Sequence, residues 1–127
     1  MSGCKFRTWD KRARVMEQYH YLQLSPNGQL YHDGMNVTDN YEIVQYTGVN
    51  DAEGTEIYEG DIVRIFIPND PEEKEYISKA YKLDGAFAVN MVGHDIYTDV
   101  HCIGWIPEDY SVEIIGNIYE SLDLIKN

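Results

Sequence analysis

Several residue types and motifs that mark common functional classes are missing from this 127-residue chain. Its two cysteines, Cys4 and Cys102, are too few for a disulfide framework. It has no Cys-x-x-Cys pair, no glycine-rich loop of the kind that cradles a phosphate, and no serine nucleophile elbow. No apolar run approaches the roughly 20 residues of a membrane span, and the start of the chain shows no apolar signal segment. We therefore expect a cytoplasmic protein with no cofactor and no membrane association.

Positive charge is absent from the middle of the sequence. Between Val15 and Val63 there is no Lys or Arg, whereas nine Asp and Glu residues occur there. The whole chain carries 22 acidic and 10 basic residues, and its net charge is −12. A surface of this kind repels phosphate backbones and attracts basic partners. The charge thus favours a protein partner over nucleic acid; the alternative is that it serves only to keep the chain in solution.

The residues that are present are typical of a folded, β-rich protein. Hydrophobic residues make up 43% of the chain and aromatic residues 13%, which is too much for a disordered segment. A length of 127 residues fits a single domain over residues 1–127. Short apolar runs alternate with glycine, proline and asparagine turns. The predicted fold class is mainly β, as a small barrel or sandwich, with a β-rich α+β fold as the alternative.

About nine short strands are expected. They are residues 5–10, 19–24, 29–32, 41–46, 62–67, 75–83, 86–92, 96–106 and 111–120. Residues 62–67 are apolar on both faces, which predicts a strand between two layers or inside a small closed sheet. Residues 75–83 fit a helix as well as a strand, but the Asp84-Gly85 turn that follows favours a hairpin. Ser121 is a helix-capping residue type, so a short C-terminal helix is expected over residues 122–125.

The most distinctive stretch is residues 45–63. Its three glycines, Gly48, Gly54 and Gly60, lie six residues apart between short apolar or aromatic pieces. Asn50-Asp51 before Gly54 is typical of a turn, and Glu59-Gly60-Asp61 predicts a tight corner that leads into the strand at residues 62–67. The stretch is therefore predicted to be a loop, a corner and a buried strand.

Three blocks of sequence resemble the YopX family of phage and prophage proteins. The first is Lys5-Phe6-Arg7-Thr8-Trp9-Asp10, which matches the family's opening motif. The second comprises Tyr46-Thr47-Gly48, the turn from Asp51 to Gly54, and Ile57-Tyr58-Glu59-Gly60-Asp61-Ile62-Val63. The third is Glu113-Ile114-Ile115-Gly116-Asn117-Ile118-Tyr119-Glu120. The blocks occur in the family's order and bracket the chain from Lys5 to Leu124.

The resemblance implies a single YopX-like domain over residues 1–127. It also implies a small accessory protein of phage or prophage origin that acts in a bacterial host. The sequence departs from the family at Ala52-Glu53, where a basic residue is common, and at Ser121-Leu122, where Asn-Pro is common. Both departures fall at loop or terminal positions and concern local turn shape. The family offers no agreed catalytic residues to carry over, so the resemblance predicts no activity.

The spacing of the candidate ligands argues against a metal-binding site. The cluster with metal-capable types is His94, Asp95, Asp99, His101 and Cys102. Neighbouring residues of a strand point to opposite faces, so His101 and Cys102 do not face one ion. A calcium loop centred on Gly54 fails as well, because Val49 and Gly60 would fall at ligand positions and neither supplies a side-chain oxygen. We therefore predict no metal ligands.

Paired carboxylates are the remaining feature that would suit a hydrolase. Glu59 and Asp61 flank Gly60, and acid–base catalysis needs two such groups in different environments. Carboxylates at a tight corner more often accept hydrogen bonds from backbone N–H groups. We therefore predict no catalytic residues, and a metal-dependent hydrolase is kept only as a third interpretation.

The central stretch is also a candidate interaction surface. The chain has eleven tyrosines, and tyrosine offers a large contact area with a polar tip, although it is also common in half-buried strands. The candidate surface consists of Asp51, Glu53, Glu56, Tyr58, Glu59 and Asp61. We predict a non-enzymatic binding module that forms a homo-oligomer and contacts a host or phage macromolecule through this acidic surface.

The alternative is a nucleic-acid-binding accessory factor that uses the N-terminal segment. Cations follow phosphates and aromatic rings stack on bases, and both residue types occur here. The candidate contacts are Lys5, Arg7, Trp9, Lys11, Arg12 and Arg14. The net charge of −12 opposes this interpretation, and the cations could instead neutralise acidic surface of the same or a neighbouring subunit.

Overall fold

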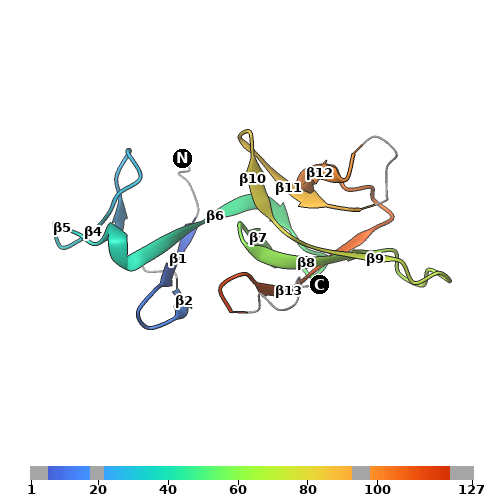
Figure 1. Cartoon of the computed structure of the whole chain (residues 1–127), viewed down its shortest axis with the longest axis horizontal. Coiled ribbons are helices and arrows are strands. Elements are labelled where there is room, and N and C mark those ends of the chain that lie inside the picture. The colour runs from blue at the N-terminus through green and yellow to red at the C-terminus, as the bar shows by residue number, and fades with distance from the viewer. Residues whose placement is uncertain (1–5, 18–21, 93–97, 121–127) are drawn as a thin grey trace. The chain divides into compact units, whose positions relative to one another are not determined.

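The computed structural model describes residues 6–17, 22–92 and 98–120, and Figure 1 labels most of their strands. Contacts within the chain divide it into two compact units, Met1–Gln45 (unit 1) and Tyr46–Asn127 (unit 2). Strand β6 (Tyr41–Asn50) belongs to both, because the boundary falls within it. Its first half pairs in unit 1 and its second half in unit 2.

Unit 1 is built from short antiparallel strands. β1 (Phe6–Asp10) pairs with β2 (Val15–Glu17) on one side and with the first half of β6 on the other. A second sheet contains β3 (Gln23–Leu24), β4 (Leu30–His32) and β5 (Met35–Asn36), and the 3₁₀ turn η1 (Thr38–Asn40) leads into β6. Among the described residues of unit 1, those that are buried are Thr8, Trp9, Leu22, Leu30 and Val44.

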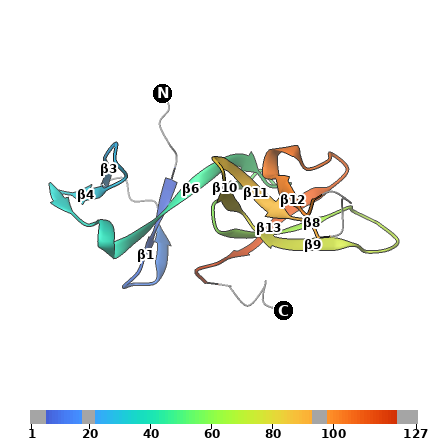
Figure 2. The ribbon, with the colours of Figure 1, turned by 45° about the horizontal axis from the view of Figure 1, so that its top comes forward.

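Unit 2 contains two three-stranded antiparallel sheets. In the first, β8 (Asp61–Phe66) lies between β13 (Ser111–Asn117) and β9 (Glu75–Lys79). In the second, β11 (Ala86–Asn90) lies between β10 (Tyr81–Leu83) and β12 (Val100–Cys102). The short strand β7 (Glu56–Tyr58) pairs with the end of β6, and the 3₁₀ turn η2 (Ile103–Trp105) follows β12. Figure 2 shows β10, β11 and β12 beside β8, β9 and β13, and β11 contacts β9.

The core of unit 2 draws residues from several of these elements. It consists of Ile57, Val63, Ile65, Ala80, Val89, Met91 and Ile103. One face of β8 is buried, because Val63 and Ile65 are each 0% exposed, and on the other face Ile62 is 0% exposed while Arg64 and Phe66 are half-buried. The prediction of an enclosed strand at residues 62–67 is therefore confirmed for the Val63 face and only in part for the other. Each fully buried apolar side chain contributes roughly 1.5–3 kcal/mol by leaving water.

The predicted β-rich fold is confirmed, with several small antiparallel sheets of which one is a half-barrel. Thirteen strands occur within residues 6–17, 22–92 and 98–120, against about nine expected. The difference arises from β2, β5 and β7, which have two or three residues each and were not expected, and from residues 75–83, which form two strands, β9 and β10, instead of one. The expected helix at residues 122–125 lies outside the described residues. No described helix is long and apolar enough to cross a bilayer.

Candidate functional site

The Tyr46-Thr47-Gly48 motif forms a bulge in β6. Between Tyr46 and Asn50, three residues of β6 face a single residue of β7. Gly48 has a φ angle of 88°, in the left-handed region that favours glycine. The Thr47 hydroxyl donates to the carbonyl of Ile57 at 2.7 Å and accepts a backbone N–H from two residues further on at 3.2 Å. The hydroxyl thus supplies hydrogen bonds where the bulge interrupts the ladder, so β6 continues past the point where the sequence predicted a loop.

Asp51 holds the turn that joins β6 to β7. Its Oδ1 accepts the backbone N–H groups of Glu53 and Thr55, each at 2.9 Å. Its Oδ2 accepts the N–H of Ile114 in β13 at 3.3 Å. One carboxylate therefore shapes the turn and fastens it to a strand from the other end of unit 2.

Gly60 and Asp61 form a junction between β7, β8 and the segment after β13. The Gly60 N–H donates to Ala80, and the Gly60 carbonyl accepts the N–H of Ile118, both at 2.8 Å. Asp61 is 2% exposed, and its Oδ2 accepts the N–H of Tyr58 at 2.8 Å. The corner therefore joins three segments of the chain through backbone groups and one buried carboxylate.

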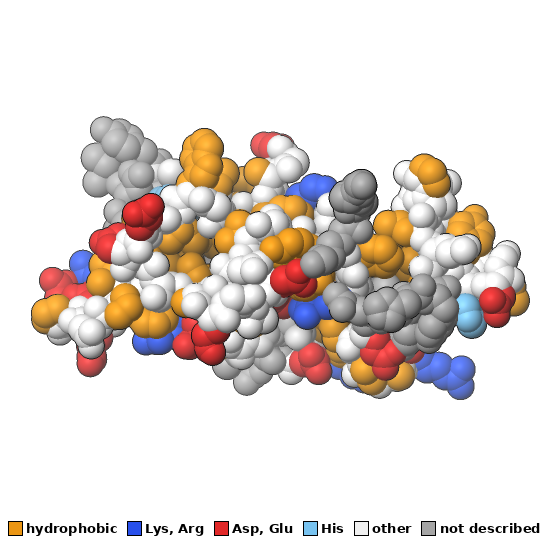
Figure 3. All heavy atoms as spheres, turned by 180° about the vertical axis from the view of Figure 1, so that it is seen from behind, with side chains coloured by type: hydrophobic (Ala, Val, Ile, Leu, Met, Phe, Trp, Pro, Cys, Tyr) orange, Lys and Arg blue, Asp and Glu red, His pale blue; other side chains and the backbone are white. Residues whose placement is uncertain are grey.

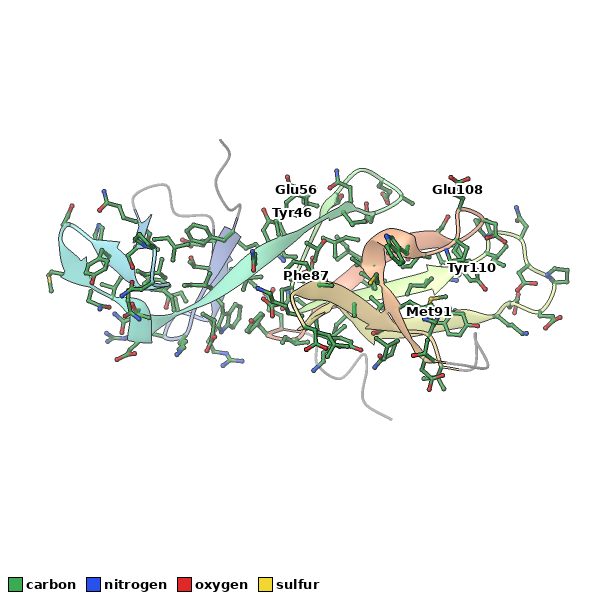
Figure 4. All side chains as sticks on the ribbon, turned by 90° about the horizontal axis from the view of Figure 1, so that it is seen from above. Tyr46, Glu56, Phe87, Met91, Glu108 and Tyr110 are labelled. Carbon is green, nitrogen blue, oxygen red and sulfur yellow. The ribbon has the colours of Figure 1, made fainter. Side chains whose placement is uncertain are left out.

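The six residues of the predicted interaction surface are thus placed at different depths. Glu53 is exposed, and Glu56 and Glu59 are half-buried. Tyr58 and Asp61 are each only 2% exposed, so they lie beneath the surface and are not open to direct contact with a partner. The Tyr58 hydroxyl donates to Glu56 at 3.0 Å, and Figure 4 shows Glu56 on β7. On the face that Figure 3 shows, acidic side chains are scattered among hydrophobic ones and do not gather into one patch.

The predicted nucleic-acid contacts are only partly accessible. Lys5 lies outside the described residues, and Arg7 is half-buried in β1. Trp9 is 6% exposed, so its ring is not open to a stacked base. Lys11, Arg12 and Arg14 are exposed in the β1–β2 turn. Lys11 lies 3.6 Å from Glu42, and the Arg14 guanidinium lies 5.8 Å from the centre of the Trp9 ring.

Of the predicted metal-capable cluster, His94 and Asp95 lie outside the described residues. Within the described part of the chain, no three His, Cys, Asp or Glu side chains are close enough together to hold an ion. His101 and Cys102 are neighbours in β12, and the Cys102 thiol forms no disulfide.

An apolar groove that the motifs did not indicate opens beside η2. It has a volume of about 360 Å³ and is called the Trp105 groove below. It is lined by Thr47, Val49, Ala86, Phe87, Cys102, Ile103, Gly104 and Trp105. Trp105 is 83% exposed at its edge, while Val49 and Phe87 pack against the core. The signal in the sequence is weak, because a single tryptophan next to a proline turn reads equally well as a buried anchor.

A second hollow, of about 560 Å³, is polar and lies between β8, β9 and the loop that joins them. Arg64 lines this hollow, and the Nε atom of Arg64 lies 2.6 Å from a carboxylate oxygen of Glu75. The same guanidinium lies 3.9 Å from Glu113 and 3.9 Å from the centre of the Phe66 ring. At its rim, a hydrogen bond and the charge of Glu72 raise the pKa of the exposed Lys74. Arg64 is thus held by its own neighbours, and the hollow offers no uncommitted positive centre for an anion.

The second and third sequence blocks are joined in the structure by the pairing of β8 with β13 and by the hydrogen bonds from Ile114 to Asp51 and from Ile118 to Gly60. The profile of the family described as YopX protein matches residues 5–126. The chain belongs to the YopX family. The protein yopX from Bacillus subtilis has a similar structure, with a TM-score of 0.71 at 24% identity over 99% of this chain and 100% of the other. Protein EF1440 from Enterococcus faecalis has a TM-score of 0.62 at 23% identity, over 98% and 99%.

No curated protein matches the chain, and these two likenesses show the fold alone. The YopX motifs in this chain are mainly structural. Thr47 and Gly48 form a bulge, Asp51 fixes a turn, and Asp61 closes a corner. The Trp105 groove lies outside the motif blocks except at Thr47, whose hydroxyl holds one wall in place.

Proposed function

We propose that this YopX-family protein is a non-enzymatic binding module of phage or prophage origin. It acts in the cytoplasm of a bacterial host and contacts a basic protein through exposed carboxylates of unit 2. The observation that carries the proposal is the distribution of charge between the units. Unit 1 contains five acidic and five basic residues, whereas unit 2 contains seventeen acidic and five basic residues. The whole net charge of −12 therefore belongs to unit 2.

The negative electrostatic field of unit 2 attracts positively charged partner proteins over long distances. Complementary charge steers encounters and sets specificity, and its effect falls as salt shortens the screening length from about 10 Å at 0.1 M to about 3 Å at 1 M. The exposed Glu53 and the half-buried Glu59 are suitable contacts, because no backbone N–H depends on them in the turn and corner that Asp51 and Asp61 hold.

Affinity purification from a bacterial host at two salt concentrations tests the proposal. We expect a basic protein, identified by mass spectrometry, to be retained at roughly 50 mM salt and released at roughly 500 mM. The variant Glu53→Gln/Glu59→Gln should retain less of it. The control Glu72→Gln/Glu73→Gln removes the same charge from the β8–β9 loop and should bind as the parent protein does. If no basic protein is retained at low salt, or if its retention is independent of salt, the proposal is wrong.

Nucleic-acid binding by unit 1 is the second candidate, and the exposed cations of the β1–β2 turn support it. Lys11, Arg12 and Arg14 contact phosphates in this version, while the buried Trp9 takes no part in stacking. The variant Arg12→Glu/Arg14→Glu should abolish a salt-sensitive rise in the anisotropy of a labelled oligonucleotide. If the parent protein produces no such rise, this candidate is eliminated. Light scattering on the same samples measures whether the protein is the predicted homo-oligomer.

A further inference from the structure

We infer that the Trp105 groove binds a partner-protein segment in which one apolar or aromatic side chain is flanked by Lys or Arg. The inference rests on the proposed function, because it specifies where a basic partner inserts its apolar residue. The Trp105 groove has an exposed ring and an apolar floor, and exposed carboxylates lie close in sequence to its lining residues. Each of these features matches one part of the proposed ligand.

Trp105 is the most exposed large hydrophobic residue of the described chain. It is 83% exposed, whereas the other tryptophan, Trp9, is 6% exposed. Burial of an aromatic ring is among the largest single contributions to association, and tryptophan is enriched where binding energy concentrates. Beside the ring, the floor is formed by Val49, Phe87 and Ile103, which belong to the core of unit 2 or pack against it. An apolar side chain placed here would contact both the ring and the floor.

Exposed carboxylates lie within a few residues of the side chains that line the Trp105 groove. Asp84 lies two residues before the lining residue Ala86, in the exposed turn between β10 and β11. Glu108 and Asp109 lie three and four residues after Trp105; both are exposed, and Figure 4 shows Glu108 pointing away from the ribbon. Glu53 is exposed in the turn that follows the lining residue Val49, four residues further along the chain. A ligand whose apolar residue has cations on either side would place these cations near the turns.

The nearby cation does not cancel this charge. Lys82, opposite Phe87 in the β10–β11 pair, lies with its Nζ 5.9 Å from the centre of the Phe87 ring. It is one positive group against the four carboxylates of Asp84, Glu108, Asp109 and Glu53. The charge around the Trp105 groove is therefore negative, which repels phosphate and argues against a nucleic-acid strand stacked on Trp105. A second copy would bring another unit 2 with the same net charge of −12, which opposes its seating there.

The wall of the Trp105 groove at Thr47 is held in place by a hydrogen bond within the protein, without a ligand. The Thr47 hydroxyl joins its wall to Ile57 at 2.7 Å, across the bulge. Gly104 has no side chain to fill the space, and a Cβ there would lie 3.8 Å from Val49. A wall that is already ordered lowers the conformational entropy that binding costs.

Peptide display on the immobilised full-length protein tests the inference, with short random peptides selected at low salt. We expect the enriched peptides to share an aromatic or large aliphatic residue with Lys or Arg beside it. Synthetic copies should bind Trp105→Ala about 30-fold more weakly, the factor that corresponds to a hot-spot residue, and Trp105→Phe should recover part of the loss. Glu108→Gln/Asp109→Asn should weaken binding about 3- to 10-fold and reduce its salt dependence. Met35→Ala removes an exposed apolar side chain of unit 1 and should change nothing.

The two tryptophans give an internal control for the position of the ligand. In a ¹⁵N-edited NMR spectrum, the indole N–H signal of Trp105 should move on addition of peptide while that of Trp9 stays in place. Failure to enrich any peptide, or equal binding to Trp105→Ala and the parent protein, overturns the inference. A dimer in light scattering that Trp105→Ala dissociates also overturns it, because the occupant would then be a second copy.

The outcomes separate this inference from the proposed function. Basic peptides that bind Trp105→Ala normally but lose affinity in Glu53→Gln/Glu59→Gln and in salt would overturn the inference and support the proposed function. Peptides that need Trp105 but carry no cations and ignore salt would overturn the inference as stated, while the proposed function would still be decided by the salt-sensitive retention of a basic protein.

Discussion

The carboxylate of Asp51 accepts a hydrogen bond from the backbone N–H of Ile114, which lies 63 residues further along the chain, at 3.3 Å. The same side chain accepts the N–H groups of Glu53 and Thr55 within its own turn. A residue that the sequence suggested as a contact for a partner is therefore engaged by the fold itself. It fastens unit 2's β6–β7 turn to β13 together with the backbone hydrogen bond that Ala52 donates to the carbonyl of Val112 at 2.8 Å.

The first prediction concerns this residue. Asp51→Ala removes the acceptor of three backbone N–H groups, and each hydrogen bond to a charged acceptor contributes roughly 1.5–3 kcal/mol, with partial compensation by water in a half-exposed turn. We expect the free energy of unfolding to fall by about 2 kcal/mol in urea denaturation. Glu53→Ala, an exposed carboxylate in the same turn, is the matched control and should stay within about 0.5 kcal/mol. Equal effects of the two variants would contradict the role given to Asp51.

The second prediction concerns the bulge in β6. Thr47→Val keeps the shape of the side chain but removes the hydroxyl that donates to Ile57 at 2.7 Å. A carbonyl that loses its donor costs about 1–3 kcal/mol, so the midpoint of urea unfolding should fall accordingly. Thr55→Val, in the exposed turn, should have little effect. Because Thr47 also lines the Trp105 groove, peptides selected on the parent protein should bind Thr47→Val less well.

The third prediction compares two glycines with nearly equal backbone angles. Gly60 has a φ angle of 90°, and a Cβ there would meet Ile118 and Tyr119 at 3.3 Å. Gly54 has a φ angle of 85° with nothing within 4 Å of a Cβ. Both alanine variants bear the left-handed strain of roughly 1–2 kcal/mol, but only Gly60→Ala also crowds its neighbours. Thermal unfolding should therefore show a larger loss for Gly60→Ala by about 1–3 kcal/mol, and a Gly54→Ala loss as large would be inconsistent with the junction described.

The fourth prediction concerns alkaline pH. Burial, reinforced by the nearby Tyr76 phenol, raises the pKa of Tyr110 above its ordinary value of 10. Because the folded state holds this proton more tightly than the unfolded state, the contribution of Tyr110 to stability is complete below about pH 10 and is lost as the pH rises through the folded pKa. Above about pH 10, the unfolding free energy of Tyr110→Phe should therefore fall less steeply with pH than that of the parent protein. The absorbance of phenolate in the folded parent protein locates the titration, and parallel stability curves for the two proteins would contradict this assignment.

Much of the local structure could be predicted from sequence because it depends on neighbouring residues. The hairpin between β3 and β4 forms about Pro26 and Gly28, and the hairpin between β10 and β11 forms about Asp84-Gly85. The enclosed strand β8 was visible as an apolar run bounded by the Gly60 corner and Pro68. The full length of β6 could not be predicted from the sequence. The Thr47 hydroxyl supplies a hydrogen bond across the bulge at Gly48 only because β7 lies opposite.

The candidate site was less predictable than the fold. Carboxylates near glycine turns looked alike in sequence, yet Asp51 and Asp61 bind backbone groups while Glu53 is exposed. Trp9 was a candidate for stacking on bases, yet it is buried, whereas Trp105, which no motif indicated, is 83% exposed. Exposure depends on what covers a side chain, and the covering elements come from distant parts of the chain.

The sequence by itself determined the family, the β-rich fold class, most turns, and a net charge of −12, since these follow from motifs, residue patterns and counts. Only the tertiary structure decided which charges and rings are accessible. It assigned the net charge to unit 2, enclosed Tyr58 and Asp61, and left Trp105 at the edge of an apolar groove. The physical reason is that burial and long-range hydrogen bonds, such as the one between Asp51 and Ile114, arise between residues that the sequence holds far apart.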